Sequence, residues 1–147
     1  MWGEVGVGEG LVSRGALVRG GAGFAGEVEH LRSTRTARCR CGAVGCWETL
    51  VGQAALLERA GRPASAGRAG VGAVLAAAAG GEAEAIGALA VCARWLGLGL
   101  AALINVLNPA VVVLGGLFAP DPSGDRRGTR RGDRAACPRP RSTVSAS

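Results

Sequence analysis

Four residues of the kind that bind zinc lie close together in the first third of the sequence. Cys39, Cys41 and Cys46 fall within eight residues, and His30, the only histidine, lies nine residues before the first of them. Three thiolates and one imidazole complete the tetrahedral shell of Zn²⁺, and a closed shell of four protein ligands is structural rather than hydrolytic. The spacing therefore predicts a structural zinc site.

A disulfide and free thiols are the other chemistries open to these cysteines. The chain holds five Cys, an odd number, and no secretory leader follows Met1, so a disulfide framework is disfavoured. Gly42 and Gly45 allow the loop to fold tightly around an ion. Cys92 lies in an apolar segment and is expected to be a small buried hydrophobe, whereas Cys137 needs no role.

Two carboxylates flank the cysteine cluster. Glu27 lies three residues before His30, and Glu48 lies two residues after Cys46. If the loop folds back, both carboxylates meet the imidazole edge, and their oxygens can accept hydrogen bonds from the hydroxyl groups of a polyol. The spacing alone leaves a sugar site and two solvated side chains as equal alternatives.

The charged residues divide the chain in two. All 17 basic residues are Arg, and all three Asp lie beyond residue 120. Mechanisms that need an Asp base, an Asp metal ligand or a lysine nucleophile are therefore excluded for residues 1–119. Residues 120–147 carry seven Arg, three Asp and four of the six Pro, without apolar periodicity. They are expected to form a disordered tail; non-specific phosphate binding and a shifted reading frame are the alternatives.

The first half of the sequence shows three local patterns. Residues 4–20 alternate Gly with Val and Leu around Ser13-Arg14-Gly15, which predicts a strand, a glycine loop and a hairpin. A helix is expected to begin near Trp47 or Thr49 and to end at Ala60, because Gly61 follows. Residues 62–72 are expected to be a linker rich in Gly, Ala and Arg.

Residues 82–107 show the clearest periodicity of the chain. Apolar residues spaced three and four apart predict one helix with a single apolar stripe, formed by Ile86, Leu89, Ala93, Leu96, Leu100, Leu103 and Leu107. Asn108-Pro109 ends the helix, and residues 110–114 are expected to be a strand buried on both faces. Residues 95–119 are uncharged, so a membrane span is an alternative, but a buried helix, turn and strand is favoured.

Two segments together resemble the signature of the ROK family, which groups bacterial transcriptional repressors and sugar kinases. They are Gly23-Phe24-Ala25-Gly26-Glu27-Val28-Glu29-His30 and Cys39-Arg40-Cys41-Gly42-Ala43-Val44-Gly45-Cys46-Trp47-Glu48. The resemblance extends over roughly residues 3–118, through the Leu-Gly-Gly that ends at Gly116. It implies part of an α/β actin-like ATPase fold, of the ribonuclease H-like type, in a cytoplasmic and homo-oligomeric bacterial protein that binds a small sugar or sugar phosphate.

The resemblance also implies roles for individual residues. His30, Cys39, Cys41 and Cys46 would hold zinc, and Glu27, His30 and Glu48 would contact sugar hydroxyls. Weaker expectations concern the glycines near a nucleotide in the kinases: Gly6, Gly8, Gly10, Gly115 and Gly116. ATP and Mg²⁺ are implied only if the chain derives from a kinase.

Departures from the kinase pattern favour a regulator. Kinases of the family usually have Gly-Thr where this chain has Glu4 and Val5, and Glu9 adds a second negative charge to the phosphate loop. Glu29 replaces the usual Gly and is expected to strain the sugar-facing turn. Residues 1–119 are therefore predicted to be the sugar-sensing part of a ROK regulator, without the catalytic half and without the DNA-binding domain, and not an enzyme. The alternatives are the C-terminal part of an ATP-dependent, glucokinase-like sugar kinase and a non-functional fragment.

Overall fold

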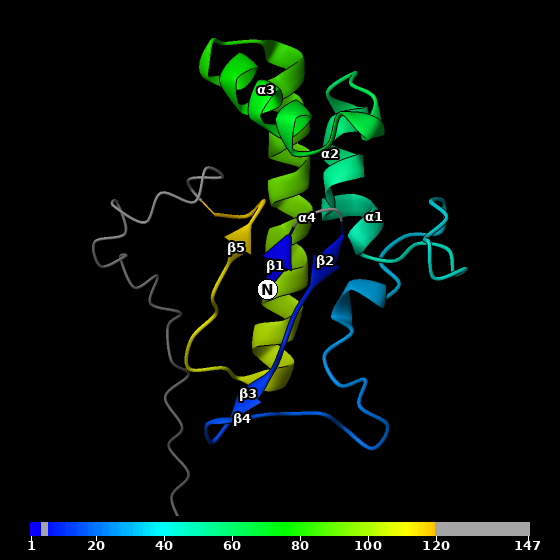
Figure 1. Ribbon diagram of the computed structural model, residues 1–147, viewed down its shortest axis with the longest axis vertical. Coiled ribbons are helices and arrows are strands. Elements are labelled where there is room, and N and C mark those ends of the chain that lie inside the picture. Colours follow the sequence, from blue (N-terminus) through cyan, green and yellow to red (C-terminus); the bar gives the residue numbers. More distant parts are fainter. Residues whose placement is uncertain (4–5, 120–147) are drawn as a thin grey trace, which may run out of the picture.

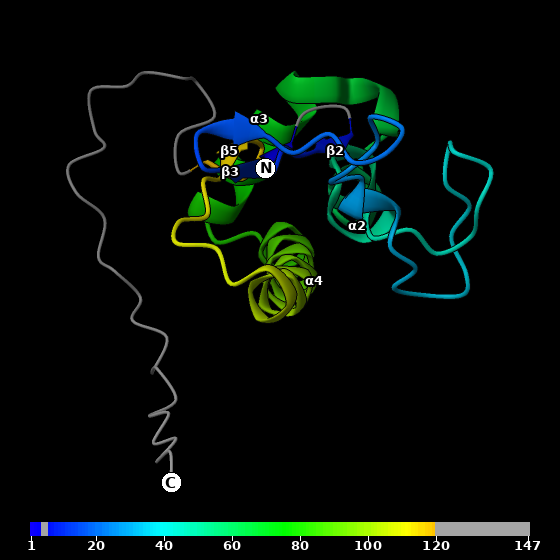
Figure 2. The ribbon, with the colours of Figure 1, turned by 90° about the horizontal axis from the view of Figure 1, so that it is seen from below.

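The computed structural model describes residues 1–3 and 6–119, which form a mixed α/β structure. A small sheet lies on one side of the long helix α4 (Ala83–Leu107) (Figure 1). Three shorter helices pack along α4: α1 (Glu48–Val51), α2 (Gln53–Arg59) and α3 (Gly67–Ala79). Viewed along α4, the sheet and the loop of residues 31–46 lie in different directions from the helix (Figure 2). The tail predicted for residues 120–147 lies outside the described residues.

The sheet brings the beginning of the chain beside residues 115–116. Its order is β2-β1-β5, with β1 (Trp2–Gly3) antiparallel to β2 (Val7–Gly8) and parallel to β5 (Gly115–Gly116). A separate hairpin joins β3 (Val12–Ser13) to β4 (Ala16–Leu17). Its two turn residues, Arg14 and Gly15, have φ values of 52° and 78°, as the two-residue turns that match strand twist require. The predicted hairpin is confirmed.

Helix α4 confirms the helix predicted from the apolar periodicity, but not the whole stripe. Leu89 packs on one core cluster and Leu96, Leu100 and Leu103 on another. Ile86 is 47% exposed and Leu107 42% exposed, and the fully buried residues of the helix are Ala85 and Ala88. The predicted burial of Ile86, Ala93 and Leu107 is therefore wrong. The residues of α4 that are buried with those of α3 are instead Ala85 and Ala88, which lie beside the predicted stripe.

The helix predicted from Trp47 to Ala60 is interrupted at Gly52. Helix α1 (Glu48–Val51) ends there, and α2 (Gln53–Arg59) begins after it. Gly52 has an extended conformation, with φ −72° and ψ 168°, and a Cβ at this position would lie 2.8 Å from the carbonyl oxygen of Glu48. The predicted ends were correct, and the break was missed.

The linker predicted for residues 62–72 is wrong. A 3₁₀ turn, η2 (Ala64–Ala66), leads into α3 (Gly67–Ala79). Gly70, Val71 and Val74 are the buried residues of α3. Together α2, α3 and α4 bury one set of side chains, called here the helical cluster: Leu56, Leu57, Ala60, Val71, Val74, Ala85 and Ala88.

The strand predicted for residues 110–114 is also wrong. This segment has no strand conformation, and Val111 and Val113 are 73% and 70% exposed. Its backbone is joined to the start of the chain, since the amino group of Met1 donates to Val113 O at 2.8 Å and Gly115 N donates to Met1 O at 3.0 Å. The exposure of these valines shows that the segment is not buried on both faces.

Helix α4 is the one helix in the described part of the chain that is long and apolar enough to cross a membrane. Length and composition are the basis of that match, and the core helices of water-soluble proteins meet the same criterion. In this structure α4 packs against α1, α2 and α3.

Candidate functional site

The four predicted zinc ligands lie together in the folded chain. One ligand atom from each of His30, Cys39, Cys41 and Cys46 lies within 4.8 Å of all the others. The Sγ atoms of Cys41 and Cys46 are 3.6 Å apart, and Cys39 Sγ is 3.8 Å from His30 Nδ1. Zinc bonds of about 2.3 Å to sulfur and 2.0 Å to nitrogen place tetrahedral ligands about 3.6–3.8 Å apart. The donor set and its spacing therefore fit one zinc ion.

The loop that carries the cysteines folds back on itself. Cys39 N donates to Ala43 O at 2.9 Å, and Gly42 N donates to Cys39 O at 3.1 Å. Gly42 and Gly45 have φ values of 89° and 83°, a conformation that side-chain-bearing residues rarely adopt. The turns at these two glycines bring Cys41 and Cys46 face to face, as the sequence predicted.

Trp47 anchors the loop to the helices. Its side chain is 2% exposed, and its Nε1 donates to the carbonyl oxygen of Trp95 on α4 at 2.9 Å. It packs in a second group of buried residues, called here the sheet cluster: Val7, Trp47, Leu50 and Val51. The indole lies against Gly99, where any Cβ would collide with the ring. Because Trp47 is fixed in the core, its two neighbours in the sequence, Cys46 and Glu48, are held in place as well.

The three loop cysteines are free thiols in different environments. Burial raises the pKa of Cys39 to about 12 and also raises the pKa of Cys46, whereas a hydrogen bond from the backbone of Ala43 lowers the pKa of the exposed Cys41. Zinc binds the thiolate form and must displace these protons. Cys41 is therefore the thiol most ready to meet an incoming ion.

Glu48 connects the cysteine cluster to the glycine loop. Its Oε1 accepts a hydrogen bond from Cys39 Sγ at 3.3 Å, and its Oε2 accepts one from Val7 N at 3.3 Å. A Cβ on Gly6 would lie 2.6 Å from Oε2, so glycine at this position makes room for the carboxylate. A groove of about 170 Å³ lies beside Glu48, and its other polar side chains belong to Arg38, Cys39, Arg40, Thr49 and Glu58.

The other two predicted sugar contacts lie elsewhere. Glu27 and His30 are not among the residues that line the Glu48 groove. They instead form a group with Glu29, in which one ligand atom from each residue lies within 4.8 Å of the others. The structure therefore joins Glu48 and His30 through Cys39, while Glu27 lies close to His30 in a second group, with Glu29.

In the sequence, Glu29 stands out only as a departure from the family pattern. It lies in the 3₁₀ turn η1 (Val28–His30), is 7% exposed, and does not belong to the residues with positive φ. The strain expected from replacing Gly with Glu is therefore wrong, because the turn has a backbone that any residue adopts. A Glu directly before the only His, two residues after another Glu, was the signal for this group.

Three of the five predicted nucleotide glycines line an open hollow. They are Gly8, Gly10 and Gly115, which lie there with Met1 and Trp2, and Glu9 has the one charged side chain among the described residues of the lining. Gly6 lies at Glu48 instead, and Gly116 lies so close to Gly3 that no Cβ fits between them. The amino group of Met1 donates to Val113 O, and no basic side chain of the described residues lines the hollow, so the Glu9 carboxylate disfavours a phosphate chain there.

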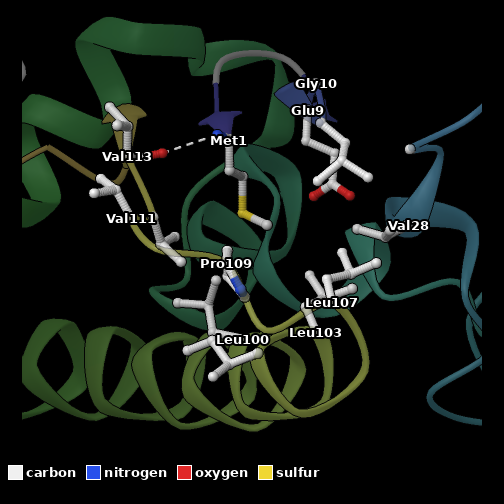
Figure 3. Close-up of a pocket in the computed structure, with 14 residues that line it drawn as sticks. Met1, Glu9, Gly10, Val28, Leu100, Leu103, Leu107, Pro109, Val111 and Val113 are labelled. Atoms are coloured by element: carbon white, nitrogen blue, oxygen red, sulfur yellow. Dashed lines mark hydrogen bonds between the residues drawn. The ribbon is translucent and has the colours of Figure 1, made fainter. Parts of the chain in front are cut away.

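A second cavity lies between the start of the chain and the C-terminal half of α4. It has a volume of about 200 Å³, and Figure 3 shows Met1 reaching into it between Val113 and the leucines of α4. Among the described residues, Glu9 has the one charged side chain in its lining, and burial together with the neighbouring Glu29 raises the pKa of Glu9 to about 7. Since the other lining side chains are apolar, this cavity does not suit a polyol.

Comparison with solved structures relates the fold to sugar kinases and regulators. The ROK hexokinase from Thermus thermophilus superposes with a TM-score of 0.70 and is 32% identical, over 84% of this chain and 42% of that one. A ROK family glucokinase from Streptomyces griseus, solved with glucose and AMPPNP, superposes with a TM-score of 0.69 and is 30% identical, over 79% of this chain and 43% of that one.

Sequence comparison relates the chain equally to repressors. A putative xylose repressor from Caldicellulosiruptor sp. (strain Rt8B.4) is 32% identical in an alignment of 124 residues that covers 76% of this chain and 31% of the repressor. The chain thus spans about a third of the repressor's length. Residues 4–120 match the ROK family as a whole. With these matches, and with its Cys/His loop and mixed α/β fold, the chain belongs to the ROK family.

Proposed function

We propose that residues 1–119 are the sugar-binding part of a ROK-family transcriptional regulator, with a structural zinc ion on His30, Cys39, Cys41 and Cys46. The observation that carries this proposal is the position of Glu48, whose carboxylate bridges the cysteine cluster and the glycine loop at the wall of a polar groove. Four protein ligands leave zinc no open position, so its role is to hold the loop rather than to activate water.

The groove at Glu48 supports a neutral polyol as the ligand. Carboxylate, hydroxyl and guanidinium groups converge there from Glu48, Thr49, Arg38 and Arg40, and such groups accept and donate the hydrogen bonds that sugar hydroxyls need. Glu27 and His30 are proposed as further sugar contacts. The relatives point to the same ligand class, since one is named a xylose repressor and another was solved with glucose.

The regulator is preferred to the kinase because of charge. The phosphates of ATP are negatively charged, and the glycine loop of this chain holds Glu4 and Glu9. Among the described residues, the glycine hollow carries Glu9 and no basic side chain. The kinase alternative is supported by the hexokinase and glucokinase structures.

Sugar binding to the whole chain tests the proposal. Titration with xylose and with glucose, followed by tryptophan fluorescence, is expected to give saturable binding of one of them. Glu48→Gln is expected to weaken that binding about 10- to 100-fold, the cost of losing hydrogen bonds to a charged acceptor, with little change in zinc content. Glu84→Gln, an exposed carboxylate on α4, is the matched control. Unchanged binding by Glu48→Gln would remove Glu48 from the site.

A coupled assay of ATP consumption tests the kinase alternative against the regulator proposal. The regulator proposal predicts no turnover with either sugar in the presence of Mg²⁺ and ATP. Turnover that depends on sugar would favour the kinase instead.

A further inference from the structure

Glu29 is a buried carboxylate with an unpaired oxygen. The residue is 7% exposed, and its Oε2 has no hydrogen-bond partner among the described residues. Burying a carboxylate oxygen without a partner is costly. The other oxygen of the same carboxylate, Oε1, faces the imidazole of His30. A donor on that ring would therefore help to satisfy the buried carboxylate.

His30 faces the Glu29 carboxylate with a ring nitrogen that can donate. The two nitrogens of its ring face different neighbours, since Nδ1 lies 3.8 Å from Cys39 Sγ and Nε2 lies 3.9 Å from Glu29 Oε1. A metal ion on Nδ1 fixes the proton on Nε2, because a ring nitrogen that binds metal cannot also carry a proton. The proton would then point toward the carboxylate. Both ring nitrogens would be engaged, so His30 would face a sugar through its ring carbons alone.

We infer that Glu29 positions His30 for zinc, as the carboxylate that accepts the Nε2 proton when Nδ1 binds the ion. This inference rests on the zinc site proposed above. Carboxylates, backbone carbonyls or water usually fix histidine ligands in this way, orienting the ring and raising its basicity. A shift of about 1 Å would shorten the present 3.9 Å separation to hydrogen-bond length.

The role requires an acceptor oxygen at a fixed position, rather than a negative charge as such. Glutamine keeps an acceptor oxygen at the same place, whereas alanine and glycine remove it. Glu29 has no positive φ, so alanine fits its backbone without strain. The series Glu29→Gln, Glu29→Ala and Glu29→Gly therefore separates the acceptor from the rest of the side chain.

Zinc affinity of the whole chain, measured by competition with a chelator, is the first test. Glu29→Ala and Glu29→Gly are expected to weaken zinc binding about 10- to 100-fold, the usual cost of removing the group that orients a ligand. Glu29→Gln is expected to retain most of the affinity. Glu84→Gln, an exposed carboxylate far from the cluster in sequence, is expected to bind zinc like the unaltered chain.

The single histidine makes a direct second test possible. In a ¹⁵N-labelled chain loaded with zinc, every imidazole signal belongs to His30. The unaltered chain is expected to show one tautomer, with the proton on Nε2 protected from exchange. Glu29→Ala is expected to lose that protection while the amide spectrum of the helices stays the same, an effect that a general loss of folding would not produce.

The outcomes separate this inference from the zinc proposal. If the unaltered chain binds no zinc, the zinc site and the inference both fail. If it binds zinc and the three Glu29 variants bind it equally well, with the Nε2 proton equally protected, the inference alone is overturned. Weakened binding in Glu29→Ala with recovery in Glu29→Gln supports it.

Discussion

The helical cluster and the cysteine loop are stabilised in different ways. Helices α2, α3 and α4 exclude water from Leu57, Val74 and Ala85, each of them 0% exposed. Between residues 31 and 44 the only buried residue is Cys39. The helices are therefore held by packing of small apolar side chains, whereas the loop is held by backbone hydrogen bonds and by the cluster of thiols.

This difference indicates which part of the molecule depends on a metal ion. A loop with so little buried apolar surface offsets only a small part of the entropy lost on ordering, and a bound zinc ion would supply the remainder. The helical cluster does not need the ion. The following four predictions test that division.

Trp47→Ala is expected to have the largest effect, because Trp47 joins the two regions. Removing a buried aromatic side chain costs about 3–5 kcal/mol, and here the hydrogen bond to Trp95 O is lost as well. Urea unfolding of the whole chain measures the change. Trp2→Ala, at a position 56% exposed, is the matched control and should cost far less. Equal costs would show that Trp47 is not the link.

Leu57→Ala is expected to destabilise the helical cluster without affecting the metal site. Leu57 is fully buried, and Leu→Ala in a core costs about 2–5 kcal/mol. Urea unfolding should show that loss, while the zinc content of the folded chain stays the same. A parallel loss of zinc would mean that the two regions fold as one unit.

Cys41→Ser is expected to remove the zinc ion while the helical cluster stays folded. About one zinc per chain should fall to none, as measured by metal analysis. The stabilisation by added zinc, about 2.7 kcal/mol at one hundred times the Kd, should vanish while the helical circular dichroism persists. Cys92→Ser removes a thiol that contacts Arg59 instead of the loop cluster and should keep the ion. A metal-free chain with an ordered loop would end the zinc proposal.

Glu9→Gln is expected to have the smallest effect, and only at higher pH. The folded state holds the Glu9 proton up to about pH 7, whereas the unfolded chain releases it near pH 4.5. The folded state thus binds more protons in this window, and stability falls as the pH rises from 4.5 to 7. Glutamine should remove that fall, a gain of about 1 kcal/mol at pH 8 after solvent screening and none at pH 4. Glu58→Gln, on the exposed side of α2, should change neither value.

The sequence was most informative where residue type and spacing act locally. The hairpin at Arg14-Gly15 and the helix α4 follow from turn chemistry and apolar period, and both were predicted. Helix α3 was not predicted, because its run of Gly and Ala shows no apolar period in the sequence. Its buried face becomes evident only in the structure, where Leu57 packs against Gly70. The strand at residues 110–114 was wrong because a buried strand needs neighbours on both sides, which its own residues do not specify. Proximity of the cysteines was predictable, whereas the burial of Glu29 required the folded turn.

The uncovered valines beside β1 have a practical consequence for any work on the isolated chain. Ala110–Leu114 is uncharged and rich in β-branched residues, Val111 and Val113 are largely exposed, and only Met1 and the edge strand β5 lie along one side. Such a row of unpaired backbone and apolar side chains is a template for intermolecular strand pairing. Aggregation of the chain should therefore increase with protein concentration, and dilution should reduce it.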